Sequence, residues 1–286
     1  MGRDVAIVTD STAYLAADRA GAAGISVVPL QVVVDGRSLD EETEFGPREL
    51  TDALRRRVRV STSRPSPRTF LDVYESVVPA GASAVVSVHI SGRLSGTADA
   101  ARLAAKDAAV PVEVVDSQSL GMGLGYAVLA AAEVADAGGT PTQVADVARR
   151  RAELTSAFFY VDTLEYLRRG GRIGAAQALL GTALAVKPLL HLQGGEIQPL
   201  EKVRTSSRAV ARLEELALER AGANPVDVAV HHLANADRAD ALAQRLRARL
   251  PAVDELVVSE VGAVIGAHVG PGLLAVVVSP KLPGSE

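Results

Sequence analysis

Residues 84–97 read AVVSVHISGRLSGT, and this stretch shows the unit from which the first half of the chain is built. A β-branched run of strand length, Ala84 to Ile90, leads into a loop of hydroxyl and glycine residues. A helical pattern follows from about Thr97 to Ala108. Strands that alternate with helices of this length predict parallel βαβ units.

The same alternation extends to both sides of this stretch. Further strands are expected at Val5 to Thr9, Ile25 to Val34 and Val112 to Asp116. Helices are expected at Ser11 to Ala22, Pro47 to Arg57 and about Leu120 to Ala137, with another after the loop at 137–141. The pair Asp35-Gly36 is a turn signal that ends the long extended run. We therefore predict an α/β fold whose N-terminal domain holds a doubly wound, mostly parallel sheet.

The second half has a different pattern, in which strands outnumber helices. Gln193-Gly194-Gly195 separates two extended runs and predicts a hairpin. Five strand segments are expected, near 157–161, 187–192, 196–203, 226–231 and 255–258, and a sixth near 273–278. Two longer helices, at 206–220 and 237–250, suit one face of a mixed, largely antiparallel sheet. This is an α+β domain, and we place its boundary with the first domain near Glu153.

Composition excludes several classes of protein. The chain has 286 residues, 48% hydrophobic and 22% charged, with a net charge of −4. A mildly acidic chain has no global attraction for nucleic acid, so no nucleic-acid partner is predicted. The absence of cysteine excludes disulfides, thiolate catalysis and cysteine-bound zinc. The N-terminus lacks the apolar core of a signal peptide, and no apolar run approaches the roughly 18 residues of a membrane span, which predicts a cytoplasmic protein.

Four loops that follow predicted strands carry small hydroxyl residues just before a helix. They are Thr9 to Thr12, Ser61 to Ser66, Ser91 to Thr97 and Asp116 to Ser119. Ligands bind at the carboxyl ends of strands in such sheets, and helix N-termini attract anions. For any one of these loops ordinary helix capping is the more common explanation, and Asp10 and Asp116 fit as caps or as hydrogen-bonding posts for neighbouring loops. The loop from Ser91 to Thr97 has three hydroxyls and two glycines in seven residues, which favours an anionic ligand there.

Other motifs give little support for catalysis or for a cofactor. The glycines of Gly121-Met122-Gly123-Leu124-Gly125 lie within a helical pattern, so close packing explains them better than a dinucleotide does. The five histidines show no metal-ligand spacing, and no nucleophile elbow is present. His268, in a glycine-dense turn at 266–272, could donate a hydrogen bond to an anion.

A basic cluster lies at 168–172, with the sequence RRGGR. A helix C-terminus explains Arg168 and Arg169, since arginine is favourable there and glycine suits the cap. Arg172 lies beyond the glycines and is not explained in this way. Arg204 is a second exposed basic position, and the planar fork of arginine suits phosphate.

Seven stretches together carry a family resemblance. They are TDSTAYL, TSRPSP, SGRLSGT, VVDSQSLGMGLG, DTLEYLRRGGRIG, GEIQPLEKVRT and GAVIGAHVGPG, in that order over almost the whole chain. In these stretches the chain resembles the DegV family of bacterial fatty-acid-binding proteins. It departs from the family at Arg64, where members often carry glutamine, and at Gly92-Arg93, where a serine or other residue is common.

The resemblance implies an N-terminal α/β domain at 3–153, a C-terminal α+β domain at 154–282, and a ligand cleft between them. It implies one buried long-chain, palmitate-like fatty acid. The carboxylate would be held by hydroxyls and backbone N–H groups, carried over by motif to Thr62, Ser95 and Gly96, with His268 nearby and Ser91 as a weaker candidate. Burying a carboxylate requires several donors, which the loop around Ser95 supplies. Burying the acyl chain contributes about 0.8 kcal/mol per CH₂ before costs.

The resemblance also implies a role. The protein would be a carrier with no catalytic residues, cofactor or metal of its own, serving lipid metabolism or presenting the acid to a separate fatty-acid kinase. Arg172 and Arg204 would help to dock that kinase, and transient contact with a membrane surface fits the same role. Two alternatives stay open at this point. One is a phosphotransfer or hydrolytic enzyme that uses the same loops with His268 as its base, and the other is a regulatory module that senses the lipid.

Overall fold

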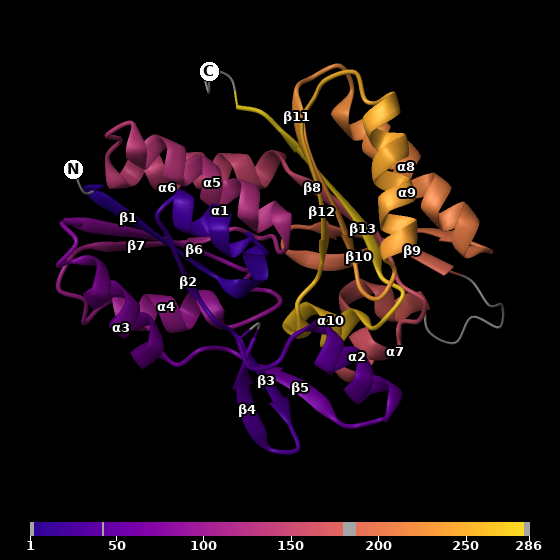
Figure 1. Ribbon diagram of the computed structural model, residues 1–286, viewed down its shortest axis with the longest axis horizontal. Coiled ribbons are helices and arrows are strands. Elements are labelled where there is room, and N and C mark those ends of the chain that lie inside the picture. The colour runs from indigo at the N-terminus through magenta and orange to yellow at the C-terminus, as the bar shows by residue number, and fades with distance from the viewer. Residues whose placement is uncertain (1–2, 42, 180–186, 283–286) are drawn as a thin grey trace. The chain divides into compact units, whose positions relative to one another are not determined.

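The computed structural model describes residues 3–41, 43–179 and 187–282. The chain divides into two compact units (Figure 1). The first comprises Met1–Gln31 and Thr62–Glu153, and the second comprises Val32–Ser61 and Leu154–Glu286. The second unit therefore takes in the segment 32–61, whereas the sequence places this segment in the N-terminal domain.

The first unit is built on a four-stranded parallel sheet. Its order is β2 (Ile25–Val28), β1 (Val5–Asp10), β6 (Ala84–His89) and β7 (Val112–Asp116). Every residue of β1 and β6 is buried, as expected for central strands covered on both faces. The carboxyl ends of these strands carry the loops singled out from the sequence. The doubly wound α/β prediction is confirmed.

Helices cover both faces of this sheet. Figure 1 shows α3 (Pro67–Val77) and α4 (Thr97–Ala105) on one side, with α5 (Met122–Asp136) and α6 (Pro141–Leu154) on the other. Phe70 and Tyr74 of α3 and three alanines of α4 share one core cluster with Val8 and Val85 of the sheet. Small residues on α4 let that helix approach the strands closely, which brings its N-terminus over their carboxyl ends.

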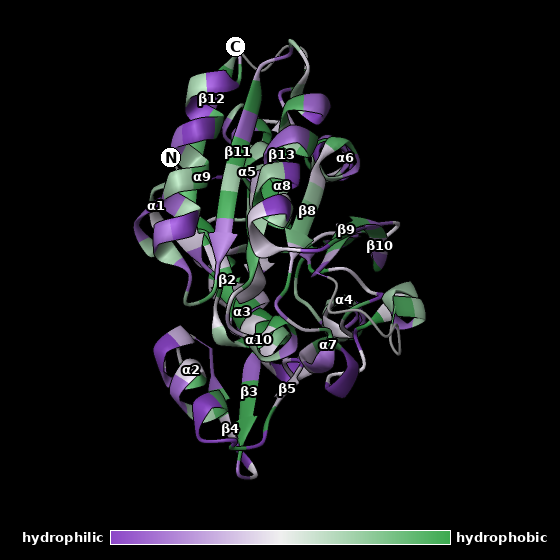
Figure 2. Cartoon of the chain, turned by 90° about the vertical axis from the view of Figure 1, so that its right-hand side faces the viewer, coloured by the Kyte–Doolittle hydropathy of each residue, from purple (hydrophilic) through white to green (hydrophobic). Residues whose placement is uncertain are grey.

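The second unit holds a six-stranded mixed sheet. Its order is β10 (Glu196–Val203), β9 (Lys187–Gln193), β8 (Ser156–Tyr160), β13 (Leu274–Pro280), β11 (Val226–His232) and β12 (Val253–Glu260). Neighbouring strands are antiparallel except for β11 and β12. Helices α8 (Ser206–Ala221) and α9 (Ala236–Arg249) share one core cluster with this sheet. Figure 2 shows both helices with hydrophilic and hydrophobic bands, the pattern of helices that bury one face. The predicted α+β half is confirmed.

A small third sheet has the order β4 (Arg37–Asp40), β3 (Gln31–Val34) and β5 (Val60–Ser63). Asp35 and Gly36, with φ of 48° and 79°, form the turn between β3 and β4, so the turn prediction is confirmed. Helix α2 (Pro47–Arg55) follows and packs against α10 (Ala263–Val269). The remaining helices are α1 (Ala17–Ala22), α7 (Glu165–Arg169) and the 3₁₀ helices η1 (Ser11–Ala13) and η2 (Gly174–Leu179).

Three local predictions are wrong, each for an identifiable reason. A single helix over 11–22 does not form, because Tyr14 takes a left-handed conformation with φ of 49° and separates η1 from α1. The long strand over 25–34 is divided into β2 and β3 by Pro29, which has no N–H for a strand ladder. The glycine-dense turn at 266–272 begins as helix α10 instead. Gly266 lies inside that helix, where a Cβ would be 2.4 Å from Leu50 Cδ2, so close packing and not a turn accounts for this glycine.

Candidate functional site

Hydrogen bonds to Ser91, the first residue of the loop between β6 and α4, hold this loop in shape. Ser91 accepts the Leu94 and Ser95 N–H groups at its carbonyl, both at 3.0 Å. The Ser91 hydroxyl accepts the Arg93 N–H at 3.2 Å and is fully buried. The half-buried Ser95 hydroxyl lies 2.8 Å from that of Thr97. Ser91 therefore shapes the loop, while Ser95 presents its hydroxyl beside the start of α4.

The start of α4 has no side-chain cap from its N-cap residue. Its N-cap is Gly96, which has no side chain with which to cap the helix. The first N–H groups of an α-helix have no partner within it, and the helix dipole gives them partial positive charge. Gly96 and Ser95 thus lie at a helix N-terminus that a small anion can approach. Capping, the alternative considered from the sequence, is not supplied by Gly96.

Asp10 braces this loop from β1. One oxygen of its carboxylate accepts the Ile90 N–H at 2.9 Å and lies 3.0 Å from His89 Nδ1. The other accepts the Thr12 N–H at 3.1 Å and the Thr12 hydroxyl at 2.5 Å. Asp10 is fully buried, so these donors have no water to replace it. One carboxylate therefore ties the loop after β1 to the last residues before Ser91.

The loop at 116–119 braces the same strand end from β7. The Ser117 hydroxyl donates to the His89 carbonyl at 2.7 Å, and the Ser91 N–H donates to the Ser119 carbonyl at 2.9 Å. The Gly92 N–H donates to Asp116 at 3.1 Å, and a Cβ on Gly92 would lie 2.7 Å from the same carboxylate. Asp10 and Asp116 thus act as hydrogen-bond acceptors that hold neighbouring loops, as expected from the sequence.

The segment after β5 reaches the loop from another direction. Thr62 lies in β5 and is half-buried, and Arg64 follows the strand. Arg64 Nη1 lies 3.5 Å from the Gly96 carbonyl, so TSRPSP and SGRLSGT are in contact. Within the first unit the structure therefore brings together the segments that carry Thr62, Ser95 and Gly96. Arg64 was noted in the sequence only as a departure from the family, and no local signal marked it as a site residue.

A buried chain of hydrogen bonds lies beneath the loop. His89 Nε2 is 2.6 Å from the Ser87 hydroxyl, to which the Tyr74 hydroxyl donates at 2.9 Å. Burial raises the pKa of Tyr74 to about 12, so its phenol keeps its proton. Together with Asp10 these groups have the Ser–His–Asp order of a hydrolase triad. All are at most 1% exposed, which denies Ser87 the access that a nucleophile needs. This hydrogen-bond network therefore orders the core and offers no accessible nucleophile at Ser87.

In the second unit, two motifs that are distant in sequence pack closely because glycines leave room for the facing side chains. A Cβ on Gly170 would lie 2.0 Å from His268 Nδ1, and one on Gly270 would lie 2.2 Å from the Tyr166 ring. Helices α7 and α10 make this contact. The motifs DTLEYLRRGGRIG and GAVIGAHVGPG therefore form one cluster around His268. No spacing within the sequence indicated which glycine would face which side chain.

His268 is a neutral group in this cluster. Burial, with a smaller effect of the Arg172 charge, lowers the pKa of His268 to about 4. Arg172 donates to the Gly170 carbonyl at 2.7 Å and so belongs to the same cluster. Arg204 lies elsewhere in this unit, exposed and directly before Thr205, the N-cap of α8. His268 can therefore offer an anion a hydrogen bond at neutral pH, but no charge.

Two buried histidines predict an acid-sensitive fold. Burial also lowers the pKa of His231 to about 4 from 6.5. Because the unfolded chain binds these protons more readily, stability is full above pH 6.5 and falls as the pH drops towards 4. The expected loss at pH 5 relative to pH 8 is about 2 kcal/mol for each histidine. Urea denaturation at both pH values measures it, and His268→Gln is expected to remove its share. A wild-type stability that does not change between them would contradict the prediction.

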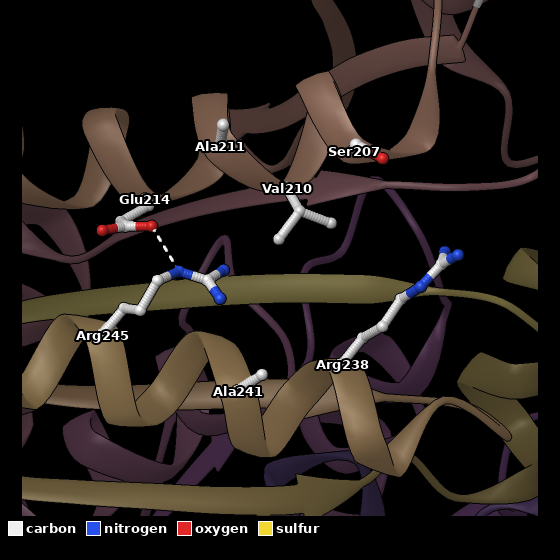
Figure 3. A pocket seen from close by; sticks show the side chains of 7 residues that line it. All are labelled: Ser207, Val210, Ala211, Glu214, Arg238, Ala241 and Arg245. Atoms are coloured by element: carbon white, nitrogen blue, oxygen red, sulfur yellow. Dashed lines mark hydrogen bonds and ion pairs between the residues drawn. The ribbon is translucent and has the colours of Figure 1, made fainter.

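A separate groove lies between α8 and α9 (Figure 3). It has a volume of about 310 Å³ and is lined by Ser207, Val210, Ala211, Glu214, Arg238, Ala241 and Arg245. Burial opposes ionisation of Glu214, but hydrogen bonds from Arg245 and Arg249 outweigh it and lower its pKa. The groove contains none of the residues predicted from the sequence. The Glu214 carboxylate links the middle of α8 to the C-terminal part of α9.

Neither a metal-binding cluster nor a membrane-spanning helix is present among the described residues. Among residues 3–41, 43–179 and 187–282, no group of three or more histidine, aspartate or glutamate side chains could hold a metal ion. In the same part of the chain, every helix is too short or too polar to cross a bilayer.

Comparison with known proteins gives consistent matches over the whole chain. The model of the DegV family of uncharacterised proteins matches residues 4–281. A DegV domain-containing protein of Streptomyces coelicolor is 61% identical over 281 residues, covering 98% of this chain and 100% of that protein.

Two solved structures are similar in both fold and sequence. A DegV family protein from Thermus thermophilus, described as fatty-acid binding, has a TM-score of 0.92 and 36% identity, covering 98% of this chain and 100% of that one. DegV from Bacillus subtilis, described as a fatty-acid-binding protein, has a TM-score of 0.89 and 33% identity with the same coverage.

Proposed function

The chain belongs to the DegV family, and on that premise we propose that it binds a single long-chain fatty acid. The observation that carries the proposal is the loop from Ser91 to Thr97, which ends at the uncapped N-terminus of α4. The first backbone N–H groups of α4 have no partner within the helix, and the Ser95 hydroxyl lies beside this helix start; a buried carboxylate requires donors of these kinds. The fatty-acid binding described for the relatives from Thermus thermophilus and Bacillus subtilis supports the same ligand class.

The proposal gives each candidate residue a different role in binding the carboxylate. Ser95 and the backbone at Gly96 donate to the carboxylate, and Thr62 adds a hydroxyl from β5. His268 contributes one uncharged hydrogen bond, in keeping with its lowered pKa. Ser91 contributes through the shape of the loop, because its hydroxyl already accepts the Arg93 N–H. We keep 3–153 and 154–282 as the proposed limits of the two family domains.

We further propose that the protein is a carrier rather than an enzyme. In this role it presents the acid to a separate kinase, with Arg172 and Arg204 on the docking surface, and exchanges it during brief contact with a membrane. The burial of Ser87, His89 and Asp10 supports a role without nucleophilic catalysis. A pull-down with Arg172→Ala and Arg204→Ala tests the docking residues, since both variants are expected to weaken capture of a kinase subunit. Equal capture by wild type and both variants would remove these residues from the docking surface.

Extraction of the purified protein under denaturing conditions tests the ligand. Mass spectrometry is expected to find about one equivalent of long-chain fatty acid, because burial of about 0.8 kcal/mol per CH₂ keeps the ligand bound. Ser95→Ala is expected to weaken binding about tenfold or more, as loss of a hydrogen bond to a charged group does.

Ser76→Ala is the matched control. The Ser76 hydroxyl is exposed and donates to the Val73 carbonyl of its own helix, so this variant is expected to retain wild-type affinity. Recovery of a nucleotide or sugar phosphate with no lipid would overturn the proposal.

A further inference from the structure

Arg64 is a cation that lies beside the candidate anion loop. Its side chain is exposed, and its hydrogen bond to the Gly96 carbonyl is at the long limit of 3.5 Å. Among the described residues no carboxylate lies within ion-pair distance of it. Arg68, four residues later, shows the contrast, since its guanidinium pairs with Asp72 at 2.7 Å. A charged group therefore lies against the candidate anion loop while its own charge is not paired with an acid.

Gly96 provides the space for this guanidinium. A Cβ on Gly96 would lie 2.3 Å from Arg64 Nη1, 3.1 Å from Cδ and 3.3 Å from Cζ. The backbone of Gly96, with φ of −76° and ψ of 19°, is one that other residues adopt readily. Glycine is therefore needed here for close approach and not for its conformational freedom. The contact between Arg64 and Gly96 is a packed one, although the side chain is exposed.

Two carboxylates at this loop have partners, since Asp99 pairs with Arg102 and Asp116 accepts the Gly92 N–H, and the other groups favour an anion. The N-terminus of α4 supplies only partial charge, and the hydroxyls of Ser95 and Thr97 supply none. Arginine carries a full charge in a planar fork that matches the two oxygens of a carboxylate. A head group held at Ser95 and Gly96 would lie beside that fork. The long contact with a neutral carbonyl is readily exchanged for a shorter, charge-assisted bond.

We propose that Arg64 is the cation that pairs with the ligand's head group and makes this protein select an ionised fatty acid over its neutral analogue. The inference rests on the proposed function, because it concerns the same ligand. It adds a residue that recognises the charge of the head group, whereas Thr62, Ser95 and Gly96 recognise its oxygens. Glutamine at this position would keep a hydrogen-bond donor and lose the charge.

Binding of two ligands by Arg64→Gln tests the inference. The ligands are palmitic acid and the saturated alcohol of the same length, and delipidated full-length protein is titrated with each above the pKa of the free acid. We expect Arg64→Gln to weaken binding of the acid about tenfold to a hundredfold, as loss of a charge-assisted pair does, and to leave the alcohol unchanged. Added salt is expected to weaken acid binding by wild type more than by the variant. Arg68→Gln is the matched control and is expected to bind both ligands as wild type does.

Gly96→Ala provides an independent check. The new methyl group displaces the flexible end of Arg64 rather than any backbone, so the fold is expected to persist. Its loss of acid affinity should be clearly smaller in the Arg64→Gln background than in wild type, because the two changes act on one contact. Additive losses would show that Gly96 acts without Arg64 and would count against the inference.

The outcomes separate this inference from the proposed function. If wild type binds the acid and Arg64→Gln binds it equally well, the inference fails and the proposed function stands. If the variant loses acid and alcohol alike, Arg64 only shapes the loop, and the inference again fails. If wild type binds neither ligand, the proposed function itself fails. Equal thermal unfolding of wild type and Arg64→Gln, expected for an exposed side chain, shows that binding and not folding has changed.

Discussion

Asp10→Ala is expected to lower the free energy of unfolding by about 3–5 kcal/mol, because it leaves several buried donors without their acceptor. Asp10 accepts four hydrogen bonds or close polar contacts, from the Thr12 N–H and hydroxyl, the Ile90 N–H and His89 Nδ1. Alanine leaves all of these donors in a fully buried place without an acceptor. Each unsatisfied buried donor costs about 1–3 kcal/mol, so even partial relaxation leaves a large loss. Urea denaturation at neutral pH measures the change.

Asp116→Ala is the matched control for this prediction. Asp116 also ends a strand of the parallel sheet and accepts two N–H groups, from Gly92 at 3.1 Å and Gln118 at 2.9 Å. It is only half-buried, so water can replace the carboxylate. We expect a loss of about 1 kcal/mol, that of an ordinary hydrogen bond. If both variants lose the same stability, burial does not decide the importance of these carboxylates.

Gly270→Ala is expected to lower the free energy of unfolding by about 3–5 kcal/mol, combining backbone strain and overpacking. Gly270 has φ of 74° and ψ of 169°, a region that residues with a Cβ rarely adopt. A Cβ there would also lie 2.2 Å from Cδ2 of the Tyr166 ring and 2.4 Å from Cε2. The ring is rigid, and moving it separates α7 from α10. The same loss of packing is expected to disturb His268, which faces Gly170 in this cluster.

Gly194→Ala separates the two contributions. Gly194 also has a positive φ, of 57°, but a Cβ there would meet no atom within 4 Å. Its substitution is expected to cost about 1 kcal/mol, from backbone strain alone. Thermal or urea unfolding of the two variants gives the comparison. Similar losses in both would show that contact with Tyr166 adds nothing, and would contradict the packing argument.

Much of the secondary structure could be predicted because its signals are local. The alternation of β-branched runs with helical patterns placed β1, β6 and β7 within one residue of their observed ends. Asp35-Gly36 marked its turn because both residues tolerate a positive φ. The resemblance to the DegV family, now supported by a match over residues 4–281, also depended on short motifs in order.

The errors arose where a distant contact overrides a local signal. Glycines near 266–272 indicate a turn, yet Gly266 lies within helix α10, and glycine is needed there because Leu50, from a distant part of the chain, occupies the space that a Cβ would take. The chain of Ser87, His89 and Asp10 was missed in the same way, since it joins two strands that are far apart in sequence. Neither pairing leaves a spacing that can be recognised along the chain.

The hydroxyl- and glycine-rich loop from Ser91 to Thr97 illustrates both what could be predicted from the sequence and what depends on the tertiary structure. Its residue types and its place between a strand and a helix were enough to mark it as a candidate anion site, because a helix N-terminus is a local feature. Only the tertiary structure decided that Asp10 and Ser117 brace the loop and that Arg64 lies against Gly96. The physical reason is that propensity and capping act over a few residues, whereas bracing and charge pairing depend on which distant segments the packed core brings together.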